Sequence, residues 1–344
     1  MAPTAQEHAR QRQLLLFQKL LNQREGASPL TLVLDTLEQP SGPIITEFAL
    51  RAKKAAKAKI IYVTFGTLKR HPHADVHVST RNKSLAAVRT ELLRHYPPYD
   101  PKQKNPPQRA LVILDALNPL ATSAPDSLSA FLSNIITPAT SLVAIYHADV
   151  PLVPPPHAHN EYAPHPLAVL THLATAVLKL SALDQEIERH KARNRSVQEP
   201  EFGLAEGREG VLIGMRPQRR DSAGSGLVVD MEVRRRSGRG VTGKFVVSTP
   251  PAPERRKGAL ARFCLLEAHP AFAPEEEEEG GGAKEGDGPE STFDLGLTAK
   301  QRRDRDGVVL PYFDAQTDIG AGEGGRILYD MGREDDFDDE EDEI

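Results

Sequence analysis

The sequence predicts an α/β domain with a mainly parallel β-sheet that is covered by helices on both faces. Four short runs are apolar along their whole length and rich in β-branched residues, at 30–35, 59–65, 109–115 and 141–147. Segments with helical spacing of apolar residues follow them, at 44–59, 84–95, 126–136 and 165–175. Strands without polar alternation are buried on both faces, and their alternation with helices favours parallel pairing.

The first elements are a helix, a strand and a second helix. Apolar residues at helical spacing predict a helix over 14–24, which ends before Gly26. The strand 30–35 follows. A turn signal at 39–43 separates this strand from the helix 44–59.

The same alternation continues through the next three strands and helices. Ser123 or Asp126 is the candidate N-cap of the helix 126–136, because short polar side chains accept hydrogen bonds from the first N–H groups of a helix. The helix 165–175 runs into an apolar segment at 176–180.

Beyond this apolar segment the pattern changes. Residues 186–210 are charged and irregular, which predicts a loop insertion. Segments 226–233 and 241–247 flank a turn-forming Ser-Gly-Arg-Gly and predict a β-hairpin. Residues 211–215 are a candidate for one more strand, whereas residues 250–257 predict a loop.

These patterns divide the chain into four regions. We expect an α/β domain over 1–268, an acidic and glycine-rich linker over 269–290, an extended C-terminal segment over 291–329 and a disordered acidic tail over 330–344. The tail holds ten acidic residues against one arginine, although the net charge of the whole chain is only -5. It is either a solubilising segment or a recognition segment in which Phe337 contacts a partner.

Cysteine content and hydropathy limit the compartment and the chemistry. Cys264 is the only cysteine, so an intramolecular disulfide, a zinc site made of cysteines and a two-cysteine redox site are excluded. The first apolar run, at 14–17, is too short for the core of a signal peptide. No run approaches the roughly 18 apolar residues that span a membrane. We expect a cytoplasmic and nuclear protein with no membrane partner.

An open parallel sheet binds phosphates after its first strand, which is at residues 35–44 here. A nucleotide-hydrolysing loop (Walker A) needs several glycines, a lysine for the β- and γ-phosphates and a Ser or Thr for magnesium. This segment has no lysine, one glycine, two prolines without N–H donors, and Glu38, which repels a triphosphate. We therefore expect no nucleotide site and no cofactor.

The third strand ends in Asp115, the position of a magnesium-binding acid (Walker B) in nucleotide hydrolases. Without a phosphate loop this acid has no magnesium to hold. The favoured interpretation is an acid that caps a loop at the carboxyl edge of the sheet. The alternative is a residual contact to a nucleotide across a subunit boundary. We expect no catalytic residue in this chain.

Two histidine-rich segments and the cysteine also invite a chemical interpretation. Three histidines and an acid lie within 71–77, but a proline and the alternating pattern are typical of an extended loop with solvated side chains. His157 and His159 lie in a proline-rich loop. Cys264 has no catalytic histidine nearby in sequence, and a small buried apolar role is the favoured interpretation. We expect no metal site.

Two basic sets remain. The first is typical of a solvated helix face and comprises Arg51, Lys53, Lys54, Lys57 and Lys59. The second lies at the turn of the predicted hairpin, with Lys244 nearby. Arginines at such a turn project together into solvent, which suits contact with an RNA backbone; the alternative is a solvated hairpin tip. The candidate RNA-contact residues are Arg234, Arg235, Arg236 and Arg239.

The C-terminal stretch has an unusual composition for a part of a sheet core. Two extended apolar segments flank a short basic helix, over residues 291–316. Because it follows so long a linker, this stretch is suited to docking on another protein. The residues expected to dock are Phe293, Leu295, Leu297, Leu310, Pro311, Tyr312 and Phe313.

The chain resembles the fungal, Iki1-like family of fifth subunits of the Elongator complex. The resemblance lies in the motifs Phe-x-Leu-x-Leu-Thr and Leu-Pro-Tyr-Phe of this stretch, in the acidic end and in the segment 14–35. The resemblance implies a RecA-like fold without Walker A. It also implies a hetero-hexameric ring of two trimers, in which this subunit lies between the fourth and sixth subunits and its C-terminal segment reaches the fourth.

The resemblance further implies a function. The ring binds tRNA, and the catalytic Elongator subcomplex installs carboxymethyl-type groups at C5 of the wobble uridine. A non-catalytic structural subunit is the favoured interpretation. The alternatives are a RecA-type ATPase subunit with an atypical nucleotide site, and a free RNA-binding regulator that is stable as a monomer.

Overall fold

The structure is a computed structural model. It describes residues 5–23, 28–68, 70–98, 108–153, 162, 164–202, 226–234, 240–250, 254 and 258–272. The chain divides into two compact units, Met1–Gly280 and Gly281–Ile344. All the described residues belong to the first unit.

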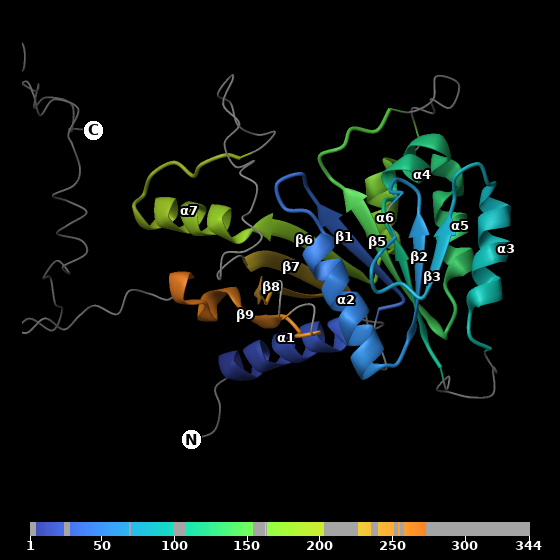
Figure 1. Cartoon of the computed structure of the whole chain (residues 1–344). Helices are drawn as coiled ribbons and strands as arrows, with labels where there is room; N and C mark the ends of the chain where they lie inside the picture. Colours follow the sequence, from blue (N-terminus) through green and yellow to red (C-terminus); the bar gives the residue numbers. More distant parts are fainter. Residues whose placement is uncertain are drawn as a thin grey trace, which may run out of the picture. The chain divides into compact units, whose positions relative to one another are not determined.

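The described residues form a nine-stranded sheet (Figure 1). In chain order the strands are β1 Leu30–Asp35, β2 Lys59–Thr64, β3 Val76–Ser79, β4 Ala110–Leu114, β5 Thr140–His147, β6 Ala176–Ala182, β7 Gly226–Arg234, β8 Gly240–Ser248 and β9 Arg262–Leu265. Their order in the sheet is β3-β2-β4-β5-β1-β6-β7-β8-β9. The pairs from β3 to β6 are parallel, and those from β6 to β9 are antiparallel.

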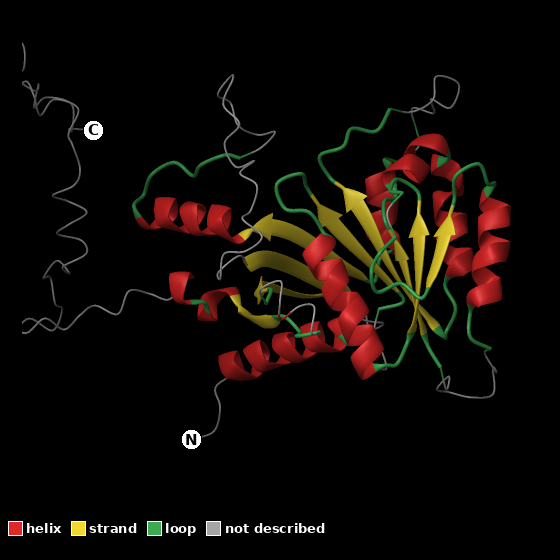
Figure 2. Ribbon diagram, viewed as in Figure 1, coloured by secondary structure: helices red, strands yellow, loops and turns green. Residues whose placement is uncertain are grey.

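Helices cover both faces of this sheet (Figure 2). They are α1 Ala5–Leu21, α2 Gly42–Ala55, α3 Leu85–His95, α4 Asn118–Ser123, α5 Leu128–Ile135, α6 Pro166–Leu173 and α7 Leu183–Asn194. Side chains of α1 and α2 join the apolar core on one face, and those of α3 to α6 join the core on the other. The predicted fold class, α/β with a mainly parallel sheet between two helical layers, is confirmed.

The central strand β1 shows why its sequence is mainly apolar. Val33 faces the core that contains α1 and α2, whereas Leu30 and Leu32 face the opposite core. Successive side chains of a strand point to opposite faces, and both faces are covered here. Apolar residues are therefore favoured on both faces, and the buried polar residues Thr31 and Asp35 are the exceptions.

The antiparallel part of the sheet extends it beyond β6. The predicted hairpin is confirmed as β7 and β8, and β9 adds a third antiparallel strand that the sequence did not indicate. Helix α1 packs on these strands: the Phe17 ring stacks on Phe245 with centroids 4.3 Å apart and meets Phe263 edge-on at 5.2 Å. Aromatic pairs of this kind add about 0.5–1.5 kcal/mol to the burial of the rings.

Several helix ends differ from the prediction. Helix α1 begins at Ala5 rather than residue 14, because Ala, Gln, Glu and Arg favour helix even without an apolar stripe. Helix α2 ends at Ala55 rather than residue 59, since Lys57 adopts a φ of 47° and the chain turns directly into β2. The predicted cap of α5 is wrong: a 3₁₀ turn, Pro125–Ser127, precedes this helix, and Ser127 caps it without a side-chain hydrogen bond.

Elements were also missed. The predicted helix 165–175 is confirmed as α6, but the apolar segment 176–180 that it was expected to run into belongs to strand β6, whose alternating burial fits a strand with one more polar face. Residues 183–194 form helix α7, so the predicted irregular insertion 186–210 is wrong in its first part. Ion pairs three residues apart stabilise α7, at Glu186 with Arg189 and at Glu188 with Lys191. Residues 211–215 lie outside the described residues.

Candidate functional site at the carboxyl edge of the sheet

The parallel strands β1, β2, β4 and β5 end at the same edge of the sheet (Figure 1). In open parallel sheets this edge is where ligands bind. Strand β5 lies between β1 and β4, so the loop after β1 neighbours the loop after β5. The segment expected to lack a phosphate site and the acid Asp115 are both at this edge.

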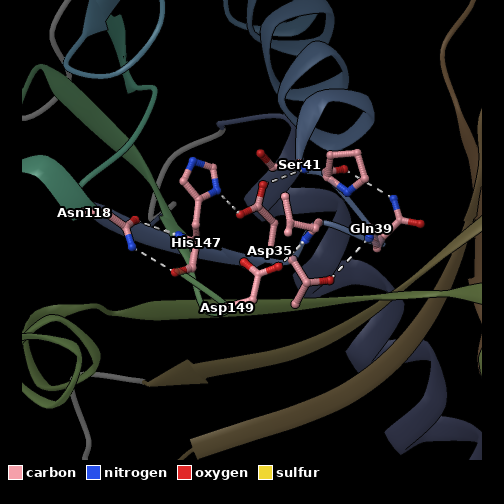
Figure 3. Close-up of polar contacts among 9 residues, drawn as sticks. Asp35, Gln39, Ser41, Asn118, His147 and Asp149 are labelled. Carbon is pink, nitrogen blue, oxygen red and sulfur yellow. Dashed lines mark hydrogen bonds and ion pairs between the residues drawn. The ribbon is translucent and has the colours of Figure 1, made fainter. Parts of the chain in front are cut away.

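Asp35, the last residue of β1, is buried and joins three elements. Its carboxylate accepts a hydrogen bond from the backbone N–H of Ser41, the N-cap of α2, at 2.9 Å. It also lies 2.6 Å from Nδ1 of His147, the last residue of β5 (Figure 3). The start of a helix attracts anions. Here a carboxylate of the chain itself lies beside the N-cap of α2, where its negative charge would oppose a bound anion.

Three further N–H groups of the loop after β1 are also bonded within the chain. The N–H of Leu37 donates to the Asp149 carboxylate, with 2.6 Å between N and Oδ2. Thr36 N–H donates to the carbonyl of Gln39, and Gln39 N–H donates to the Thr36 hydroxyl, both at 3.3 Å (Figure 3). An incoming phosphate would have to displace these acceptors and would meet the charge of Asp149.

Asp115 bonds to the loop after β2. Its carboxylate accepts the N–H groups of Phe65 at 2.6 Å, Gly66 at 3.2 Å and Thr67 at 2.7 Å, and the Thr67 hydroxyl at 2.8 Å. The interpretation of Asp115 as an acid that caps a loop is confirmed. The alternative interpretation, that Asp115 contacts a nucleotide across a subunit boundary, stays a prediction.

His147 carries the one titratable cation of this network. The side chain of Asn118 fixes its main chain, because Nδ2 donates to the His147 carbonyl and Oδ1 accepts the His147 N–H, both at 2.9 Å. The hydrogen bond to Asp35 raises the pKa of His147 above its ordinary 6.5; burial acts in the opposite direction, and the charges of Asp35, Asp149 and Asp115 raise it further. Positive charge on this ring is therefore favoured.

The sequence explains why the part of this edge formed by β1, β4 and β5 has so little positive charge. Residues 25–50 and 110–178, which supply β1, β4, β5 and the loops after them, contain no lysine or arginine. The same residues include Asp35, Glu38, Asp115 and Asp149. For the loop after β1 the sequence already predicted too little positive charge to hold a triphosphate; that the same holds for the loops after β4 and β5 depends on the order of the strands.

A second spacing of phosphate-loop type occurs at residues 238–245, where glycines five positions apart precede a lysine. Gly243 and Lys244 lie inside β8, opposite Met231 and Asp230 of β7. A phosphate loop joins a strand to a helix, and its next residue is Ser or Thr, whereas Phe245 stands here. This spacing therefore has no nucleotide-binding context.

The predicted RNA-contact set is described only at Arg234. This residue ends β7 and is half-exposed; its guanidinium donates to the Thr171 carbonyl at 2.6 Å and pairs with Glu232 at 3.0 Å. Arg235, Arg236 and Arg239 lie outside the described residues. The same holds for the predicted docking residues Phe293, Leu295, Leu297, Leu310, Pro311, Tyr312 and Phe313.

The first basic set is not a uniform solvated face. Arg51 is buried, forms an ion pair with Glu47 and donates to the Ala261 carbonyl at 2.8 Å, so the prediction for this residue is wrong. Lys53 pairs with Asp75 at 2.9 Å. Among the rest, Lys54 is exposed and bonds the Gly258 carbonyl, and Lys59 donates to the His95 carbonyl at 3.0 Å. The exposed lysines fit the prediction.

The histidines of 71–77 lie in and beside strand β3, which begins at Val76. The His71 ring stacks on Tyr62 with centroids 5.3 Å apart, and burial, with the charges of His73 and Lys53, lowers the pKa of His71 to about 4. Cys264 is partly buried in β9, opposite Val246. In the part of the chain that the structure describes, no three His, Cys, Asp or Glu side chains are arranged to hold a metal ion.

None of the helices in the described ranges has the length and apolar character needed to cross a membrane.

Solved structures with a similar course of chain include the flagellar accessory protein FlaH from Methanocaldococcus jannaschii, at 13% identity and a TM-score of 0.35, over 68% of this chain and 91% of that one. A KaiC-like protein from Pyrococcus horikoshii overlaps at 9% identity and a TM-score of 0.31, over 65% and 87% of the two chains.

Sequence relatives give a sharper assignment. Elongator complex protein 5 of Saccharomyces cerevisiae is 26% identical over 342 residues, which cover 95% of this chain and 96% of the relative. Elongator complex protein 5 of Schizosaccharomyces pombe is 25% identical over 327 residues, covering 92% and 94%. The model of the family Elongator subunit Iki1 matches residues 16–330. The chain therefore belongs to the Iki1 family of Elongator subunits.

Proposed function

We propose that this chain is a non-catalytic structural subunit of the RecA-like Elongator subcomplex. It assembles with the fourth and sixth subunits into a hetero-hexameric ring in the cytoplasm and nucleus. The ring binds tRNA and supports carboxymethyl-type modification at C5 of the wobble uridine. The catalytic Elongator subcomplex carries out the chemistry.

The bonding of the loop after β1 carries this proposal. Asp35, Asp149 and Thr36 accept the N–H groups of Ser41, Leu37 and Gln39, in the loop where a phosphate-binding protein of this kind would present donors to its ligand. A nucleotide would have to break these bonds against acidic repulsion. The family membership supports a role within the complex. A domain without a nucleotide site would be suited to holding its neighbours in place.

The tRNA part of the proposal depends on the hairpin. Arg234 is committed to Thr171 and Glu232, so its guanidinium orients the end of β7. Arg235, Arg236 and Arg239 follow it in sequence and supply further charge for a phosphate backbone.

Co-expression with the fourth and sixth subunits tests the structural role. We expect the full chain to co-purify with both, and a chain without residues 291–316 to lose this ability, because the apolar docking residues are removed. A chain without the acidic tail 330–344 is the control and should still assemble. A full-length chain that is a stable monomer and binds neither subunit would refute the proposal.

A further inference from the structure

Exposed apolar side chains gather on two bonded loops at the carboxyl edge. Leu37, in the loop after β1, is 68% exposed; Val150 and Val153, in the loop after β5, are 39% and 72% exposed. The hydrogen bond from Leu37 N–H to Asp149 holds the two loops together, so Leu37 lies beside the residue before Val150. Single exposed apolar residues are ordinary, but three on adjoining loops indicate a contact surface.

Two carboxylates lie within the same surface, and each is half satisfied. One oxygen of Asp149 accepts the Leu37 N–H at 2.6 Å, and one oxygen of Glu38 accepts from Gln185 at 2.9 Å. The second oxygen of each, Oδ1 of Asp149 and Oε1 of Glu38, is buried and meets no hydrogen-bond donor of the described residues. Partly buried carboxylates without a donor favour a cation more than solvated ones do.

The described residues offer little to neutralise these carboxylates. No lysine or arginine occurs in residues 25–50 or 110–178. Helix α7 touches Glu38 through Gln185, but its Arg189 is paired with Glu186 at 2.7 Å. His147 is already bonded to Asp35. Within the part of the chain that the structure describes, this surface has no permanent cation of its own, so a cation on another molecule would complement it.

We infer that Leu37, Glu38, Asp149, Val150 and Val153, the edge patch, dock a protein partner that presents an arginine or lysine flanked by apolar side chains. The apolar residues supply the area removed from water, and the carboxylates select the cation and set its position. Nucleic acid does not fit, because its phosphates would meet two carboxylates. The inference rests on the proposed function, since the partner is a neighbouring subunit of the assembly.

The double variant Glu38→Gln with Asp149→Asn removes the charges and keeps an oxygen for Gln185 and for the Leu37 N–H. The dissociation constant of its complex with the fourth and sixth subunits is measured by diluting the complex. We expect this constant to rise at least about tenfold, and its dependence on salt to weaken. The control is Glu188→Gln with Glu199→Gln, whose carboxylates are exposed and paired with Lys191 and Arg193. It should change the constant less than about twofold.

The apolar half of the edge patch is tested separately, with Leu37→Ser and Val150→Ser together. We expect a loss of affinity of about tenfold as well. Val197→Ser is the control, because Val197 is 61% exposed beyond α7. Circular dichroism melts of the isolated variants separate loss of docking from loss of folding.

The outcomes distinguish the two proposals. If the wild-type chain fails to assemble with these subunits, the proposed function fails and the inference with it. If the wild type assembles and both edge variants behave like their controls, the inference alone is refuted. Tighter binding of tRNA to the assembled charge variant, with unchanged assembly, would also refute it, because the edge patch would then border nucleic acid.

Discussion

Two acidic networks in this molecule are built in opposite ways. Where α1, α2 and β9 meet, Glu47 is buried against Arg51, and the Ala261 N–H donates to the same carboxylate at 3.0 Å. At the carboxyl edge, the cationic partner of Asp35 among the described residues is a histidine, His147. Glu38 and Asp149 pair with no lysine or arginine among the described residues. The first network is closed within the chain. The second leaves negative charge for another molecule to meet.

Removing the arginine of the closed network gives the largest expected effect. Arg51→Met leaves the Glu47 carboxylate buried without its cation, and the Ala261 carbonyl loses a donor. We expect the free energy of unfolding to fall by about 3–5 kcal/mol, measured by urea denaturation. Arg89→Met, at an exposed arginine of α3, is the control and should cost no more than about 0.5 kcal/mol. Equal effects in the two variants would mean that the comparison between the networks is mistaken.

Substitution of Asp115 tests whether an acid at the carboxyl edge also stabilises the fold. Asp115→Ala leaves the N–H groups of Phe65, Gly66 and Thr67 without an acceptor. We expect a loss of about 2–3 kcal/mol in the free energy of unfolding, and a smaller loss for Asp115→Asn, which keeps one acceptor oxygen. Neither change should remove ATP hydrolysis from the assembly. Hydrolysis by the wild-type assembly that disappears in Asp115→Asn would support the ATPase alternative.

The parts of this fold that could be predicted are those in which one residue pattern has one structural outcome. Strands such as β1 and β4 are short, rich in β-branched residues and mainly apolar because both of their faces are covered. Strand β6 was missed because its alternating Ala176–Ala182 follows an apolar helix without a break. Helix α7 was missed because most of its residues are charged or polar, and only Leu183 and Ile187 pack in an apolar cluster.

Side-chain partners were harder to predict than elements. Arg51 shares a helix with exposed lysines, and its burial depends on Ala261, which lies 210 positions away in the chain. Its spacing of four residues from Glu47 was the available signal. Likewise, the sequence identified loop 35–44 as a poor phosphate site, but not that Asp149 would bond to Leu37. Long-range pairing follows from the order of the strands, which local patterns do not specify.

The smallest expected effect is the dependence of stability on pH at His147. Because Asp35 raises the pKa of His147 above 6.5 in the folded state, the folded chain binds more protons than the unfolded chain between 6.5 and the raised value. The stabilisation is fully present below pH 6.5 and is lost as the pH rises through the folded pKa. The pKa of His71 is lowered to about 4, so its contribution to stability increases with pH, and only between pH 4 and 6.5. It therefore does not obscure the window above pH 6.5.

His147→Gln should remove this slope while leaving a polar group beside Asp35. Urea denaturation at intervals from pH 6 to 8.5 compares the variant with the wild type. We expect the wild-type free energy of unfolding to fall relative to that of His147→Gln as the pH rises. Parallel curves would mean that His147 carries no extra charge in the folded chain. The carboxyl edge would then lack even this titratable cation, and a partner would have to neutralise Asp35 as well as Asp149.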